Sequence, residues 1–453
     1  MIIITAASFL LLKAVKTSPA ALDKTTAAAL AEAKEALIGY ASTYRDDGHP
    51  NEVFGYLPMP DLGTSRNNGP LGEGNAAANF TGNTKNMTVI GRLPWRKLGI
   101  PALRDSQGEC LWYAVSGSFQ NASKANVLNW DSLGHFEVYS SNGTPAGTVS
   151  TTGTNSSQRP VAIVFSAGVA LPGQNRQAST TDTVTECSGN YDARNYLDSF
   201  SADASINNIV NYFAGTANNA TGYAYSLTNS ADGSQLSAVA LASPKKIISG
   251  DITTSVGKIV NDKILVITAD DIFKRIKLRS DFAIDVNDLL SSTPISPGST
   301  ITLTSYLNSQ APLSLPTRTP GTTGSDDVYN MCKSIPYKTN CWDKLTPRQQ
   351  NFLTNWHDNL FYTNLASPTQ ITIDGVLTVN PCNAVLIFGG ERTVRTVAPL
   401  VAQTRAVSTE KSDATMYLEG GNATSFPNGT AYSGNSFYNA ATPAADIAVC
   451  ISP

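Results

Sequence analysis

Residues 20–44 read AALDKTTAAALAEAKEALIGYASTY, and this stretch decides the fold. It is rich in Ala, Leu, Glu and Lys, which are strong helix formers. Neither Gly nor Pro occurs in residues 20–38, and Gly48 and Pro50 close the region. The stretch therefore predicts one long amphipathic helix, because a single apolar stripe recurs at helical spacing, formed by Leu22, Leu30, Ala33, Leu37 and Tyr40.

The residues before this helix are almost wholly apolar. Residues 1–12 read MIIITAASFLLL and are followed by Lys13 and Lys16. The run is shorter than the roughly 20 residues of a membrane span, and a signal peptide carries its charges before the apolar run. Joined to residues 20–44, it predicts a helix of about 40 residues that bends at Pro19. Such a helix can lie in a bilayer and pack on a globular head; an ordinary amphipathic helix after a disordered tag is the alternative.

The composition excludes several classes of protein. Charged residues make up 15% of the 453 residues, whereas about 25% is usual. Ser, Thr and Asn cover the surface instead, as in extracellular β-rich proteins. The net charge is −3, so the chain lacks the basic character of a nucleic-acid-binding protein.

Six cysteines form an even set with no CxxC pair, which excludes the usual zinc-ligand spacing. We expect disulfides formed in an oxidising compartment, with free buried thiols as the alternative. Six cysteines allow about 15 connectivities, so the pairing stays open, although Cys332 and Cys341 are close enough for a local loop. The disulfide candidates are Cys110, Cys187, Cys332, Cys341, Cys382 and Cys450.

After residue 50, short apolar runs alternate with Gly, Asn, Ser and Pro. Thr346, Pro347 and Gln349 predict a capped helix start, and a second helix is expected near Thr268, with Asp271 as the capping acid. The fold class is α+β: a long N-terminal helix packed on a β-rich globular head of one or two lobes. Strands are predicted at 136–139, 161–165, 263–267, 301–303, 371–378 and 385–388, and the domains at 1–48, 49–250 and 251–453.

A faint internal repeat runs through the head. Each copy consists of a strand, a turn with Gly, a Gln-x-Arg motif and a Tyr-Leu-acid motif. The repeat could be a chance match or a true duplication. A duplication would imply two related lobes, with the boundary between them near residue 250. The first copy contains residues 161–165, Gln174, Arg176 and 196–198, and the second contains residues 385–388, Gln403, Arg405 and 417–419.

Motifs for catalysis are missing from the sequence. It contains no GxSxG, GxxxxGK[ST] or HExxH motif. His49, His135 and His357 are widely scattered, so a His-dependent hydrolase is the weakest hypothesis. Asp270 and Asp271 are explained by helix capping without a metal. We therefore expect no enzyme, no catalytic residue, no cofactor and no metal site.

A distinctive loop, GRLPWRKLG, occupies residues 91–99, and the sequence DSQGECLWYAV occupies residues 105–115. We expect a loop that contains Trp95 and is restricted by Pro94, followed by a strand that contains Trp112 and Tyr113. We predict that these three aromatic residues pack the head against the apolar stripe of the N-terminal helix.

The same segments carry a family resemblance. Residues 33–41 (AKEALIGYA), the loop 91–99 and the strand at 105–115 resemble the type IV pilin and pseudopilin-like proteins of Gram-negative bacteria. Residues 261–268 and the Gln-x-Arg motif at 174–176 are similar to stretches in the larger members. The match is good over the first 120 residues and thin beyond them.

The resemblance implies a subunit that is stored in the inner membrane and then pulled into an extracellular filament (fimbrium). Its partners would be copies of itself and other pilins. Thr5 stands where these proteins usually carry Glu, and the prepilin leader is absent; this suits a tip or initiating subunit if residue 1 is the mature end, and a truncated start is the alternative. The expected polymerisation residues are Ile2, Ile3, Ile4, Phe9, Leu10, Leu11, Leu12, Leu22, Leu30 and Leu37.

A second hypothesis belongs to a binding class. The long polar loops and the two-lobe layout suit a surface adhesin or glycan-binding head that shares the pilin-type anchor, because function concentrates on such loops. Its partner would be a surface or glycan ligand.

Overall fold

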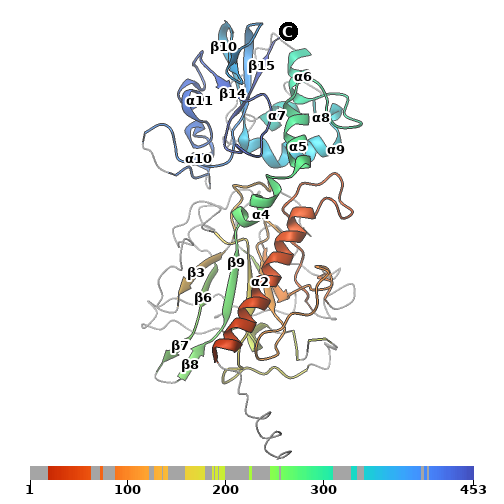
Figure 1. Cartoon of the computed structure of the whole chain (residues 1–453), viewed down its shortest axis with the longest axis vertical. Helices are drawn as coiled ribbons and strands as arrows, with labels where there is room; N and C mark the ends of the chain where they lie inside the picture. Colours follow the sequence, from red (N-terminus) through yellow and green to blue (C-terminus); the bar gives the residue numbers. More distant parts are fainter. Residues whose placement is uncertain are drawn as a thin grey trace, which may run out of the picture.

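The computed structural model is a mixed helical and β fold with an N-terminal helix and largely antiparallel sheets (Figure 1). The predicted α+β class is confirmed at this level. The predicted residues Ile2 to Leu12 lie outside the described residues. The structure describes residues 19–62, 72–74, 87–121, 127–134, 136–140, 159–178, 186–187, 189–191, 193–198, 224–226, 245–254, 257–309, 328–333, 341–398, 402–405 and 408–452.

The N-terminal helix α2 spans Pro19–Thr43 and confirms the predicted amphipathic helix over this range. Proline is tolerated at a helix start because the first N–H groups have no partner within the helix. The chain turns away at Gly48, whose φ of 81° is a conformation that glycine adopts at little cost. The predicted continuation toward residue 1 stays a prediction.

Helix α2 lies along a five-stranded antiparallel sheet in the lower half of Figure 1, where it contacts β4, β9 and helix α4. Every residue of the inner strand β4 is buried, as expected for a strand with both faces covered. The strands in spatial order are β5 (Ala224–Ser226), β1 (Met87–Arg92), β2 (Trp112–Val115), β4 (Ala162–Ser166) and β9 (Lys263–Ile267).

Two helices begin as the sequence predicts. Helix α4 (Ala269–Ile276) starts with a capping box in which the Thr268 hydroxyl accepts from the Asp271 N–H and the Asp271 carboxylate accepts from the Thr268 N–H. Helix α9 (Pro347–Trp356) has the same arrangement between Thr346 and Gln349. Each box satisfies N–H groups that the helix itself leaves unpaired.

A second sheet lies in the upper half of Figure 1. Its three antiparallel strands are β10 (Leu360–Thr369), β13 (Cys382–Phe388) and β15 (Ile447–Ile451), with β13 in the centre. The remaining helical elements are η2 (Ala193–Asn195), α5 (Ser280–Leu290), α6 (Leu303–Ser309), α7 (Val328–Lys333), α8 (Cys341–Lys344), η4 (His357–Asn359), α10 (Ser408–Lys411), η5 (Ala414–Met416) and α11 (Gly420–Ser425). The remaining strands are β3 (Phe136–Ser140), β6 (Lys245–Ser249), β7 (Ile252–Thr254), β8 (Gly257–Val260), β11 (Thr372–Ile373), β12 (Val376–Leu377) and β14 (Ser433–Gly434).

Most of the predicted strands are confirmed. The predictions at 136–139, 161–165, 263–267 and 385–388 fall on β3, β4, β9 and β13, and 371–378 is the β11–β12 hairpin. The prediction at 301–303 is wrong, because helix α6 begins there. Thr302 and Ser305 cap each other: the Thr302 hydroxyl accepts from the Ser305 N–H at 2.8 Å, and the Ser305 hydroxyl accepts from the Thr302 N–H at 2.9 Å.

One cluster of buried apolar side chains joins both sheets. It contains Leu37 of α2, Val164 of β4, Trp356 of α9 and Leu386 of β13. The predicted division at residue 250 stays a prediction; β9, which follows that point, pairs with β4 in the sheet of β5, β1, β2 and β4.

All six cysteines form disulfides, as the even count predicts. Cys332 pairs with Cys341 in the local loop that their spacing allows. The other two disulfides join residues that are far apart in sequence, Cys110 with Cys187 and Cys382 with Cys450.

We predict that Leu37→Ala lowers the free energy of unfolding by about 2–5 kcal/mol, because it leaves a cavity at a fully buried position. The matched control is Leu377→Ala, at a side chain that is 60% exposed, with an expected change within about 0.5 kcal/mol. Urea unfolding measures both, and equal losses would contradict the packing of α2 described here.

Candidate functional site

The apolar stripe of α2 faces the chain's own sheet. Leu30 and Leu37 are buried in the cluster that also holds Tyr113 and Val164, whereas Leu22 is only partly buried. A polymerisation role for these leucines stays a prediction, and the structure places Leu30 and Leu37 inside the chain's own core.

The three predicted anchoring aromatics lie in different places. Tyr113 shares the buried cluster of α2, but Trp112 lies in a separate cluster on the opposite face of the sheet. This corrects the prediction for Trp112: neighbouring residues of a strand point to opposite faces, so both cannot reach the helix. Trp95 packs on the backbone of Gly72, and Leu98 of the same loop packs against the main core instead.

Polar contacts that the sequence analysis did not identify fix α2 in place. Lys34 donates to the Val266 carbonyl at 2.9 Å and to Asp271 Oδ2 at 3.0 Å. Just beyond the helix, the buried Arg45 pairs with the buried Asp285. Burial raises the pKa of Asp285, even though Arg45 faces it. In the sequence, the only indication of these contacts is that a charged residue such as Lys34 lies beside the apolar stripe of the helix.

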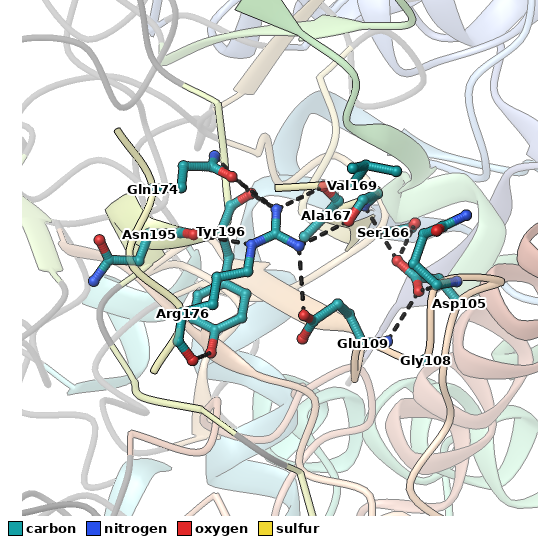
Figure 2. Close-up of polar contacts among 12 residues, drawn as sticks. Asp105, Gly108, Glu109, Ser166, Ala167, Val169, Gln174, Arg176, Asn195 and Tyr196 are labelled. Atoms are coloured by element: carbon teal, nitrogen blue, oxygen red, sulfur yellow. Dashed lines mark hydrogen bonds and ion pairs between the residues drawn. The ribbon is translucent and has the colours of Figure 1, made fainter. Parts of the chain in front are cut away.

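A loop that starts at Asp105 connects α2 with the end of β4. Figure 2 shows the Asp105 carboxylate beside Ser166. The Ser106 N–H donates to the Thr26 hydroxyl of α2 at 3.1 Å. Asp105 Oδ2 accepts from the Ser166 hydroxyl at 2.8 Å and from the Gly168 N–H at 3.2 Å. The Asp105 carboxylate therefore fixes the position of the α2 contact relative to the sheet.

Arg176 is the centre of the next network, and Figure 2 shows its guanidinium surrounded by acceptors. It donates to the Gly168 carbonyl at 2.7 Å, the Asn195 carbonyl at 3.1 Å and Gln174 Oε1 at 2.8 Å. Its guanidinium carbon lies 5.1 Å from the centre of the Tyr196 ring, a cation–π distance. Glu109 adds an ion pair at 3.5 Å.

Arg405 repeats this arrangement in the upper part of the molecule. It donates to the Gly390 carbonyl at 2.9 Å, the Met416 carbonyl at 2.6 Å and Gln403 Oε1 at 3.0 Å. Its guanidinium carbon lies 4.1 Å from the centre of the Tyr417 ring. Each arginine therefore binds a glycine just beyond an inner strand (β4 or β13), the residue before a tyrosine, and its own Gln-x-Arg glutamine.

The surrounding strands match as well. Trp112 of β2 lies 5.0 Å from Tyr196, and Phe361 of β10 lies 5.3 Å from Tyr417, as ring-centre distances. Each aromatic residue stands on a strand that neighbours β4 or β13, opposite Phe165 or Ile387. The faint sequence repeat thus corresponds to one geometry that is built twice.

The face of α2 that points away from the core is lined by small side chains. Ala27, Ala28 and Ala31 are exposed there, together with Lys24 and Glu32. We call these five residues the outer face of α2. Small side chains let another helix approach closely, so this face is the part of α2 available for contacts between molecules.

The described histidines have structural partners. His49 stacks on Tyr44 with ring centres 4.2 Å apart, and His357 lies 3.3 Å from the buried Asp358. Burial alone would raise the pKa of Asp358, but Lys411 and His357 outweigh it and lower the pKa. His135 lies outside the described residues. Among the described residues, no group of His, Cys, Asp and Glu is arranged to hold a metal ion.

An apolar groove of about 360 Å³ lies beside β15. Phe437, 54% exposed, and Ile295, 46% exposed, line it. On the β11–β12 hairpin, Val376 and Leu377 are also mostly exposed. Exposed apolar side chains of this kind are a candidate contact surface.

Comparison of the chain with protein-family models, with curated proteins and with solved structures finds no match. Within the described part of the chain, no helix combines the length and the apolar character needed to cross a membrane.

We predict that Arg405→Lys and Arg176→Lys each lower the free energy of unfolding by about 1–3 kcal/mol, because an ammonium group cannot replace the planar donor fork and leaves carbonyls unpaired. The control is Arg275→Lys, whose side chain is 46% exposed and pairs with Glu35 at the surface; we expect a change below about 0.5 kcal/mol there. Thermal unfolding measures the three variants, and similar small effects at all three would contradict the role assigned to these arginines.

Proposed function

We propose that this chain is a structural subunit of a type IV pilus or of a type II secretion-like extracellular filament. The observation that carries the proposal is the division of α2 into two faces. One face is buried on an antiparallel sheet, and the outer face is exposed and carries three alanines beside Lys24 and Glu32. The apolar residues 1–12 precede this helix in the sequence.

In this proposal the apolar residues 1–12 act first as a lipid anchor and later as the filament core. Apolar burial contributes about 25 cal/mol per Å², and it recurs at each subunit contact. Contacts of this open kind propagate as a fibre, because no symmetry closes them. The subunit would therefore lie in the inner membrane before assembly and in an extracellular filament afterwards, with copies of itself and other pilins as partners.

The head has to follow its helix during assembly. Lys34 and Arg45 tie the helix region to α4 and α5, and Thr26 ties it to the loop at Asp105. A force on α2 is thereby passed to both sheets through the shared core. Contacts between subunits would use the outer face of α2, because Leu30 and Leu37 are already buried within the chain.

We predict that Ala28→Arg reduces the yield of filaments at least about tenfold while the head keeps its stability. The reason is that a long cation would stand where another helix has to approach, and burying it without a partner is costly. Sedimentation and negative-stain electron microscopy measure the yield. The matched control is Ala366→Arg, at another exposed alanine, on β10 of the other sheet.

A chain that lacks residues 1–18 provides the second arm of this experiment. We expect it to fold and to remain unassembled. Filaments formed as readily by this chain as by the full one, or by Ala28→Arg as by Ala366→Arg, would overturn the proposal.

The apolar groove supports a second candidate, a surface adhesin or glycan-binding head on the same anchor. The exposed ring of Phe437 offers the kind of apolar platform on which a sugar ring or an apolar side chain packs. Binding of the full chain to immobilised glycans and to cell surfaces, compared with Phe437→Ala, tests this candidate. No binding by either form would dispose of it.

A further inference from the structure

The repeated geometry extends to a pair of buried carboxyl groups. Asp262 stands directly before β9 and Asp446 directly before β15, and they are 2% and 4% exposed. Asp262 Oδ2 accepts from the backbone N–H of Asp198 at 2.8 Å, and Asp446 Oδ2 accepts from that of Glu419 at 2.9 Å. In both copies the donor residue is the acid of the Tyr-Leu-acid motif.

The second carboxyl oxygen, Oδ1, is in the same situation in Asp262 and Asp446. Oδ1 of Asp262 and Oδ1 of Asp446 are both buried, and neither has a hydrogen-bond partner in the described part of the chain. The same two residues form no ion pair among the described residues. A buried carboxylate in such surroundings is costly, whereas the neutral acid is much less so.

The charged groups around each pair are few. Asp262 faces Asp198 and, further away, Arg176, whose N–H groups donate to backbone carbonyls and pair with Glu109. The adjacent Lys263 pairs with Asp23 of α2.

In the second copy, Asp446 faces Glu419 and Arg405. Arg405 in turn donates to two carbonyls and to Asp131. Each carboxyl pair therefore has one arginine nearby, and that arginine is largely committed to other acceptors.

We propose that the pairs Asp198–Asp262 and Glu419–Asp446 are two corresponding proton-binding sites, which lock the Tyr-Leu-acid turn onto the adjacent edge strand in mildly acidic surroundings and loosen it as the pH rises to neutral. Each pair joins a turn to the residue directly before an edge strand, so ionisation places two negative charges at the point where the turn and the strand meet. The inference concerns folding and does not depend on the proposed function.

The pKa shifts agree with this geometry. Burial raises the pKa of Asp446 to about 7 and that of Asp198 to about 6, and burial together with the neighbouring Asp198 raises the pKa of Asp262 well above its usual value. Because these pKa values are raised, the folded state binds more protons than the unfolded state. Their stabilising contribution is then complete below about pH 4 and is lost as the pH rises toward 7.

The test is the pH dependence of unfolding for the full chain and for Asp446→Asn and Asp262→Asn. A pKa of about 7 in the folded state makes the unfolding constant of the unmodified chain, relative to that of Asp446→Asn, rise roughly 50-fold between pH 5 and pH 7. The control is Asp413→Asn, whose 37% exposed side chain caps the neighbouring turn η5; we expect it to keep the pH profile of the unmodified chain.

A second measurement on the unmodified chain covers the case in which the Asn variants do not fold. Hydrogen-exchange protection of the Glu419 and Asp198 amides, corrected for intrinsic rates, should fall between pH 5 and pH 8 by more than that of β13 amides. Two results would overturn the inference. One is parallel pH profiles of unfolding for the full chain and both Asn variants. The other is protection of the Glu419 and Asp198 amides that changes with pH as much as protection of the β13 amides does.

Discussion

The packing of α2 against the first sheet is the interaction on which the rest of the structure depends. Ala33, Leu37 and Ala41 of α2 are fully buried, and the helix contacts β4 and β9. The same core continues through α4 and Trp356 to the second sheet. Removing α2 would therefore expose the main core, and not only one face of one sheet.

The second organising feature is an arginine beyond an inner strand of each of the two larger sheets, Arg176 after β4 and Arg405 after β13. A loop that leaves a strand needs partners for its backbone carbonyls, and Arg176 and Arg405 each provide several donors in one rigid group. The ring of Tyr196 or Tyr417 packs against the guanidinium as a cation–π contact. This detailed arrangement occurs on two sheets, at the two Gln-x-Arg motifs of the sequence.

The sequence was most informative where the structure depends on local interactions. The capping boxes at Thr268 and Thr346 were readable because both partners lie within four residues of each other. Long-range features could not be predicted from the sequence. Examples are the pairing of Cys110 with Cys187 and the salt bridge of Arg45 with Asp285. Two errors had local causes: a reciprocal cap at Thr302 replaced the strand predicted there, and the alternation of side chains along β2 turned Trp112 away from α2.

The proposed function uses both faces of α2. One face holds the helix on the head of its own chain, and the outer face is free to contact a neighbouring subunit, so two subunits can join without unfolding. Electron cryomicroscopy of purified assemblies tests this most directly. We expect a helical fibre with residues 1–18 at its axis, the outer face of α2 against a neighbouring subunit, and the sheet of β10, β13 and β15 toward the outside. A compact, solitary particle, or a fibre whose contacts lie away from α2, would contradict it.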